Sequence, residues 1–205
     1  MAAFARDAGT ATYYEKRARE YDEWYLGQGR FAELNPPWWQ AEVSQLVELV
    51  RGLPVARTLD VACGTGFLTQ HLRGVTVGLD QSPGMLDVAR RRMPGRTVVV
   101  GDALRLPMAD GSFDRALTGH FYGHLPADER AVFLAEVRRV AAELVVVDTA
   151  LRPGVGPAQW IDRTLNDGSR HRIYKRYFTS TQLADELGGD RLFTGRSFVA
   201  CRVVW

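Results

Sequence analysis

Short apolar runs alternate with segments of helical apolar spacing from about residue 38 to the end of the chain. Pro36 and Pro37 precede the first of these segments, residues 38–53, in which apolar side chains recur at the spacing of one helix face. Runs that suit strands follow at 58–62, 75–80, 97–102 and 113–119. This alternation predicts an α/β sheet whose strands are connected by helices.

Local signals predict where the later helices begin. Ser82 is a suitable N-cap, and Pro83 suits the first helical position because its fixed φ is helical and its missing N–H is not needed there. Thr179 and Gln182 have the spacing of a capping box. Helices are therefore expected at residues 67–72, 83–93, 127–142 and 179–187.

The last third of the chain predicts a mixed sheet. Residues 143–148 are almost entirely apolar, as a central parallel strand would be, whereas 151–160 is expected to be loop and 171–178 extended. Residues 190–205 divide into two strands around Gly195. Because too few residues separate these two strands for a crossover helix, they must pair antiparallel.

Composition is that of an ordinary globular domain. The chain has 205 residues, 46% of them hydrophobic and 24% charged, which argues against disorder and coiled coil. No apolar run reaches the roughly 18 residues that a membrane span needs. Arg6 and Asp7 interrupt any signal peptide, so we expect a cytoplasmic protein with Cys63 and Cys201 as free thiols. A net charge of +2 does not favour a broad nucleic-acid or membrane surface, so a small-molecule partner is expected.

The glycine-rich turn after the first strand carries the candidate chemistry. Asp60 ends the strand, and Gly64 and Gly66 let the backbone of the turn approach a ligand closely. Asp80 follows at the end of the next strand, where a carboxylate can hold both hydroxyls of a ribose. The pattern indicates a nucleoside-containing cofactor. A nicotinamide dinucleotide is disfavoured, because Ala62 replaces the first glycine of the G-x-G-x-x-G fingerprint and its third position is not glycine either.

Three segments resemble class I S-adenosylmethionine-dependent methyltransferases: LDVACGTG (59–66), VGLDQSPGML (77–86) and VVGDALRLPMADGSFD (99–114). The resemblance runs from Leu59 to Asp148 and implies S-adenosylmethionine as cofactor. It implies that Asp60 and the backbone of Ala62 and Gly64 serve the methionine part, and that Asp80 binds the ribose. It also implies that Asp102 and Ala103 bind the adenine edge, and that Gly119 and His120 lie beneath the sulfonium. Gly66, Gln81 and Met85 complete the expected cofactor site.

The resemblance also implies an architecture. The expected fold is a Rossmann-like, doubly wound, seven-stranded mixed sheet with an antiparallel C-terminal strand pair, in one domain spanning 1–205. Residues 1–35 would form a lid helix region, with Tyr14 or Tyr21 covering the cofactor. Residues 36–150 would be the cofactor-binding core, and 151–205 the acceptor-pocket segment and closing strands.

His120 and His124 lie in the loop that leaves the fourth strand. Either histidine is a candidate general base, with Tyr122 as an orienting hydroxyl, or simply a hydrogen-bonded loop residue. Their i, i+4 spacing suits a metal, but no third ligand lies nearby in the sequence, so no metal is expected. The basic tract 170–176 is either a solvated face or a clamp for an anionic substrate, with Tyr174 and Tyr177 as stacking surface.

The preferred hypothesis is transfer of a methyl group from S-adenosylmethionine to an O, N or C nucleophile of a small-molecule acceptor. Two alternatives remain open: an NAD-linked reductase and a catalytically silent cofactor-binding partner of a second protein. The reductase is disfavoured because this chain contains no Tyr-x-x-x-Lys pair. We expect a monomer or homodimer that recognises no specific nucleic acid and no membrane.

Overall fold

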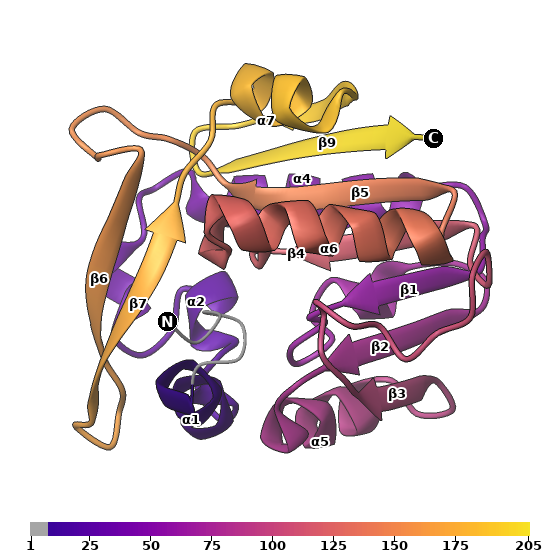
Figure 1. Cartoon of the computed structure of the whole chain (residues 1–205). Helices are drawn as coiled ribbons and strands as arrows, with labels where there is room; N and C mark the ends of the chain where they lie inside the picture. Colours follow the sequence, from indigo (N-terminus) through magenta and orange to yellow (C-terminus); the bar gives the residue numbers. More distant parts are fainter. Residues whose placement is uncertain (1–7) are drawn as a thin grey trace.

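A seven-stranded mixed sheet forms the centre of the molecule, with strand order β3-β2-β1-β4-β5-β9-β8 (Figure 1). The computed structural model describes residues 8–205. Strands β3 to β5 in this order are parallel, β9 is antiparallel to β5, and β8 is antiparallel to β9. The strands of this sheet are β1 (Thr58–Val61), β2 (Thr76–Asp80), β3 (Thr97–Val100), β4 (Arg115–Gly119), β5 (Glu143–Thr149), β8 (Asp190–Thr194) and β9 (Phe198–Val204).

Helices cover both faces of the sheet, because each face of the parallel strands is apolar. Phe133 of α6 and Leu183 of α7 join one core cluster, while Leu46 of α4 joins a second cluster on the opposite face. Figure 1 shows α6 in front of the sheet and α4 behind it. The helices are α1 (Ala8–Arg17), α2 (Glu23–Leu26), α3 (Phe31–Leu34), α4 (Trp39–Gly52), α5 (Pro83–Arg92), α6 (Ala127–Val140) and α7 (Ser180–Leu187), with two 3₁₀ turns, η2 (Thr69–His71) and η3 (Tyr122–His124).

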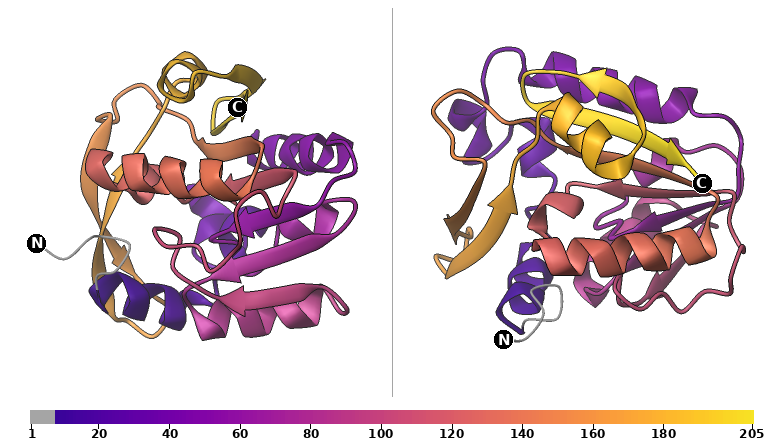
Figure 2. Two further views of the ribbon diagram at one scale, coloured as in Figure 1. Left: turned by 45° about the vertical axis from the view of Figure 1, so that its right-hand side comes forward. Right: turned by 45° about the horizontal axis from the view of Figure 1, so that its top comes forward.

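A separate antiparallel hairpin stands beside the sheet, formed by β6 (Ala158–Thr164) and β7 (Arg170–Arg176). Both views of Figure 2 place this hairpin away from the main sheet, with α1 near its turn. The N-terminal helices and the hairpin therefore wall off the same end of the molecule. None of the helices in the described part of the chain is long and apolar enough to cross a membrane.

Most predicted elements are confirmed, including the seven-stranded mixed sheet and the antiparallel C-terminal pair. The caps are also present: Ser82 Oγ accepts from the backbone N–H of Met85 at 3.1 Å, and Thr179 and Gln182 form a capping box. The N-terminal helical region is interrupted, since α1 ends at Arg17 and α2 begins at Glu23.

Two predictions about local structure are wrong. The helix expected at 67–72 is reduced to the single turn η2, and the guanidinium of Arg96 instead bonds to carbonyls at both ends of this turn, those of Thr69 and Leu72. The expected loop 151–160 includes the start of β6. That strand was missed because it is mostly exposed and lacks the apolar alternation of a half-buried strand.

Candidate functional site

A cleft opens where the carboxyl ends of β1, β2 and β4 meet, which is where parallel α/β sheets bind their ligands. It contains about 640 Å³ of empty space, part of which is open to solvent. Most of the predicted cofactor residues line it: Tyr14, Tyr21, Ala62, Gly64, Asp80, Gln81, Met85, Ala103, Gly119 and His120. His124 lies on the same wall.

Asp80 ties the end of β2 to the glycine-rich turn. The backbone N–H of Gly64 donates to its Oδ2 and that of Ser82 donates to its Oδ1, both at 2.9 Å. Burial raises the pKa of Asp80, and these backbone donors oppose the shift. Each carboxylate oxygen keeps a second lone pair, so this side chain is held in one orientation while it can still accept hydrogen bonds from a ligand in the cleft.

Asp60 lies in a small hollow of about 280 Å³ behind the turn, which shares Tyr21, Ala62 and Gly119 with the cleft. The Thr69 hydroxyl donates to Asp60 Oδ2, but Oδ1 is buried and has no partner among residues 8–205. Burial raises the pKa of this carboxyl to about 7. A buried acceptor without a donor is costly, so this oxygen favours a ligand cation or a ligand-bound water nearby.

The turn itself depends on left-handed backbone. Ala62 and Gly64 have φ of 59° and 54°, a region that glycine enters freely and alanine only at a cost of roughly 1–2 kcal/mol. Gly66 (φ 74°) does not line the cleft; a Cβ there would lie 2.7 Å from Cε of Met93. Gly66 therefore serves the packing of the turn against α5.

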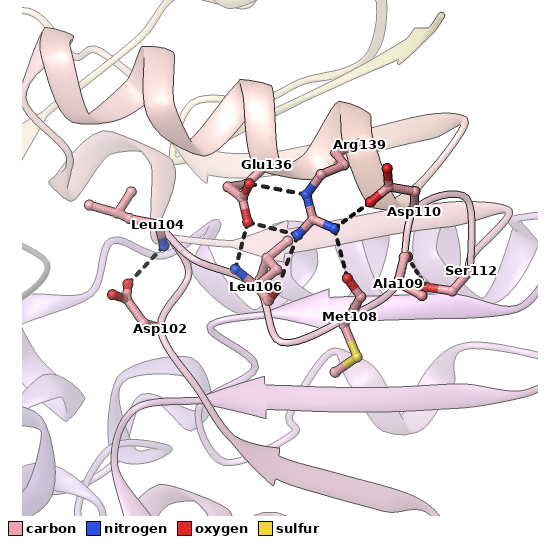
Figure 3. A network of polar contacts seen from close by, with 9 residues as sticks. All are labelled: Asp102, Leu104, Leu106, Met108, Ala109, Asp110, Ser112, Glu136 and Arg139. Atoms are coloured by element: carbon pink, nitrogen blue, oxygen red, sulfur yellow. Dashed lines mark hydrogen bonds and ion pairs between the residues drawn. The ribbon is translucent and has the colours of Figure 1, made fainter.

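The adenine side of the expected site is held by a polar network (Figure 3). Asp102 is not on the cleft wall; its Oδ1 accepts from the backbone N–H of Leu104 at 2.8 Å, which shapes the turn that places Ala103 there. The guanidinium of Arg139 donates to the carbonyls of Leu106 and Met108 at 3.0 and 2.7 Å. These contacts anchor the loop to α6. A direct role of Asp102 in binding remains a prediction.

Two contacts of the N-terminal segment hold it over the cleft. The Glu15 carboxylate accepts from the Ser82 hydroxyl at 2.6 Å and from the backbone N–H of Gly84 at 2.9 Å, at the start of α5. Asp22 pairs with Arg92 and accepts from the Thr65 hydroxyl at 2.6 Å. The segment thus contacts the glycine-rich turn directly. Residues 1–7 of the expected lid lie outside the described residues.

His120 is enclosed by aromatic rings. Its ring centroid lies 4.7 Å from that of Trp24, 5.6 Å from Tyr25 and 5.4 Å from Phe198. Neither ring nitrogen has a hydrogen-bond partner in the described part of the chain, and φ is 59°. Burial lowers the pKa of His120 to about 3. This imidazole is therefore neutral at physiological pH, unlike the free imidazole that the sequence suggested.

His124 is neutral for a similar reason. Its Nδ1 lies 2.6 Å from the carbonyl oxygen of Tyr174, which can only accept, so Nδ1 carries the proton. Burial and the charge of Lys175 lower the pKa of His124 well below its usual value. The expected role of Tyr122 is wrong: this ring is buried in the core, and its hydroxyl donates to Oε1 of Glu186 on α7 at 2.8 Å.

A second cavity of about 980 Å³ adjoins the cleft and shares Tyr14, Tyr21, His120 and His124 with it. Its other walls come from the N-terminal segment and from residues between 149 and 177, the two regions that the sequence suggested for the acceptor. Of the basic tract 170–176, only Lys175 among the basic side chains lines this cavity. Sequence analysis missed three further cations on its wall: Arg17, Arg152 and Arg163. Across the described range, no group of three or more metal-ligating side chains occurs.

Comparison with known proteins agrees with this site. A family model described as "Methyltransferase domain" matches residues 59–143. The structure of DhpI in complex with SAH superimposes with a TM-score of 0.74 and 25% identity, covering 95% of this chain and 94% of that one. Residues 59–143 form a methyltransferase domain, and the chain has the fold of the class I S-adenosylmethionine-dependent methyltransferases.

Relatives of this methyltransferase act on different compounds. A demethylmenaquinone methyltransferase of Renibacterium salmoninarum is 41% identical over 118 residues, which are 55% of this chain and 48% of the relative. A dTDP-3-amino-3,4,6-trideoxy-α-D-glucopyranose N,N-dimethyltransferase of Streptomyces venezuelae is 41% identical over 95 residues, 44% of this chain and 37% of the relative. The aligned part thus spans less than half of either relative. Because more than half of each relative lies outside the alignment, the comparison does not carry an acceptor over to this chain.

Proposed function

We propose that this chain transfers the methyl group of S-adenosylmethionine to an O, N or C nucleophile on a small-molecule acceptor. The observation that carries the proposal is the pair of adjoining cavities: one is lined by the cofactor motifs, and both share Tyr14, Tyr21, His120 and His124. Methyl transfer requires two ligands to meet end to end, and a shared wall supplies such a meeting point.

The residues of the first cavity fit the cofactor. Asp80, held by two backbone donors, would accept both ribose hydroxyls, and the unpaired Oδ1 of Asp60 would face the methionine ammonium or its water. Ala103 and Met85 would enclose the adenine, while Tyr14 and Tyr21 would cover the cofactor from the lid. We further propose that the protein acts in the cytoplasm as a monomer or homodimer. It is expected to bind no specific nucleic acid, because its net charge is only +2.

When bound, S-adenosylmethionine supplies a methyl group activated by a sulfonium leaving group. The part left to this chain is alignment and exclusion of water. The aromatic rings around His120 keep water from the meeting point of the cavities, and Gly119 lines the cleft next to His120. Neutral His120 and His124 can orient an acceptor by hydrogen bonds.

Calorimetric titration tests the proposed function. The chain should bind S-adenosylhomocysteine and S-adenosylmethionine at one site and should not bind NADH, because the turn lacks the first and third glycines of the fingerprint that binds a pyrophosphate. NADH binding with no S-adenosylhomocysteine binding would favour the reductase alternative. Cofactor binding without methyl transfer to any acceptor would favour the catalytically silent partner.

The lowered pKa values of the two histidines predict that neither histidine shapes the pH profile near neutrality. Since the pKa of His120 is about 3 and that of His124 is well below 6.5, neither ring changes charge between about pH 6 and 8. The turnover rate at saturating cofactor should therefore show no histidine inflection in that range. Rates of the wild type, His120→Asn and His124→Asn across this range provide the measurement. An inflection near pH 6.5 that vanishes in one variant would identify that residue as a titrating base.

A further inference from the structure

We propose that the acceptor is a small organic acid, bound through its oxyanion by Arg17, Arg152 and Arg163 in the second cavity. This inference rests on the proposed function and names the substrate class of the same site. An acceptor of this class carries a carboxylate or a phosphate monoester attached to an apolar body.

The wall of the second cavity is strongly cationic. Arg17, Arg152, Arg163 and Lys175 line it, and among residues 8–205 no aspartate or glutamate belongs to its lining. Guanidinium groups bind carboxylate and phosphate oxygens through two parallel N–H donors, so they suit an oxyanion better than a neutral acceptor. The cluster therefore favours a negatively charged ligand whose oxygens can accept hydrogen bonds from guanidinium groups.

The three arginine charges are not compensated by protein carboxylates. Lys175 Nζ donates to Asp148 Oδ1 at 2.6 Å, so its charge is paired. Arg17, in contrast, donates to the hydroxyl of Tyr13 at 2.6 Å and lies over the ring of Tyr21, with no ion pair to a carboxylate of residues 8–205. The same holds for Arg152 and Arg163. Arg17 is half-buried, while Arg152 and Arg163 are exposed. Three other arginines pair with acids, Arg92 with Asp22, Arg115 with Glu143, and Arg130 with Glu186.

The hairpin explains how Arg163 comes to face the cavity. In the β6–β7 ladder Arg163 lies opposite His171, whereas Asp162 lies opposite Arg172. Because successive side chains of a strand point to opposite faces, Arg163 shares its face with Lys175, and Arg172 points the other way. Arg172 indeed lies over the ring of Trp160 at 5.9 Å and is not part of the cavity lining.

The positive charges act at the meeting point of the two cavities. Burial is the main cause of the lowered pKa values of His124, Lys175 and His120; Arg163 adds to the shifts of His124 and Lys175, and Arg17 adds to that of His120. Burial raises the pKa of Tyr14, and Arg163 opposes that rise. All of these groups lie on the wall of the second cavity. The same field would favour the ionised form of an acidic ligand placed there, so such a ligand needs no general base to become an anion.

Apolar side chains line the rest of the cavity. Trp24, Phe31, Leu34 and Trp39 come from the N-terminal segment and the start of α4, and Tyr177 follows the hairpin. A ligand that fits this lining has an aromatic or aliphatic body of modest size next to its acidic group. Free inorganic anions would use the charges but not this surface.

Calorimetry on the full chain saturated with S-adenosylhomocysteine tests the proposal, with benzoate, phenyl phosphate and the neutral probe benzamide as ligands. We expect at least one of the two anions to bind about tenfold or more tightly than benzamide, and its affinity to fall with added salt. Whichever of benzoate and phenyl phosphate binds more tightly identifies the source of the oxyanion. Arg163→Gln and Arg152→Gln should each weaken anion binding by about three- to tenfold.

Arg172→Gln is the matched control, because it removes the same charge from the outer face of the same hairpin and should leave anion binding unchanged. The proposal fails if benzamide binds as well as both anions, if neither anion binds, or if Arg172→Gln weakens binding as much as Arg163→Gln. Binding of S-adenosylhomocysteine itself, measured in the same titrations, reports on the proposed function separately. A chain that binds S-adenosylhomocysteine but no anion would keep its function and lose this substrate class.

Discussion

Asp80→Asn is expected to weaken S-adenosylhomocysteine binding by about 10- to 100-fold, and Asp80→Ala by more. The carboxylate of Asp80 is oriented by the backbone N–H groups of Gly64 and Ser82 at 2.9 Å, and it faces the cleft. Replacing the charge removes two charge-assisted hydrogen bonds to a ribose, each worth roughly 1.5–3 kcal/mol and not fully additive. Calorimetric dissociation constants at fixed salt provide the measurement.

Asp87→Asn is the control for this experiment, since Asp87 is an exposed residue of α5 that pairs with Arg90 away from the cleft. Its affinity should equal that of the wild type. Thermal melts of each variant separate a lost contact from a lost fold. An Asp80→Asn protein that melts as a folded domain and binds with wild-type affinity would remove Asp80 from the cofactor site.

The cofactor side of the site could be predicted because its residues are close in sequence and sit at strand ends. Asp60 lies near the end of β1, Ala62 and Gly64 follow that strand, and Asp80 ends β2, so the parallel pairing of the two strands brings these residues together. The same local logic predicted the Ser82 cap. Such features depend on short stretches of chain and on one pairing rule.

The environment of the histidines could not be predicted in this way. The rings around His120 come from Trp24, Tyr25 and Phe198, all of which are far from His120 in the sequence and meet it only in the folded chain. Burial by these rings, not the loop sequence, lowers the pKa of His120 to about 3. The direction of Tyr122, into the core rather than into the cleft, likewise depends on its contact with α7.

Most cations that line the second cavity could not be predicted, for a related reason. The basic tract 170–176 was predicted as a candidate anion clamp because its basic residues lie close together in the sequence. Successive residues of a strand point to opposite faces, so these side chains do not all face the cavity. Of the basic side chains of this tract only Lys175 lines the second cavity, and the other cations there, Arg17, Arg152 and Arg163, lie outside the tract and come from different parts of the chain. The hairpin that carries Arg163 lacked the apolar alternation from which a strand is predicted.

Removing the carboxylate of Asp148 should destabilise the whole domain. Asp148 is 0% exposed, and it accepts from Lys175 Nζ at 2.6 Å and from the backbone N–H groups of Gly123 and Thr149 at 2.7 Å each. These contacts join β5, η3 and β7. Burial opposes ionisation, but Lys175 and the backbone donors hold the pKa of Asp148 below its usual value. The stability that this carboxylate contributes is therefore present above about pH 4 and is lost as the pH falls through its lower folded-state pKa.

Asp148→Asn would leave the buried ammonium of Lys175 without its counter-ion, a change that costs about 3–5 kcal/mol in comparable sites. For a domain of this size, that cost lowers the melting temperature by roughly 6–20 °C. Glu48→Gln, which breaks the exposed pair with Arg51, is the control and should cost about 0–1 kcal/mol. If Asp148→Asn does not fold, the double variant Asp148→Asn/Lys175→Met should, because it removes the unpaired charge as well. A single Asp148→Asn variant that melts within about 2 °C of the wild type would contradict the assignment of a structural role to this ion pair.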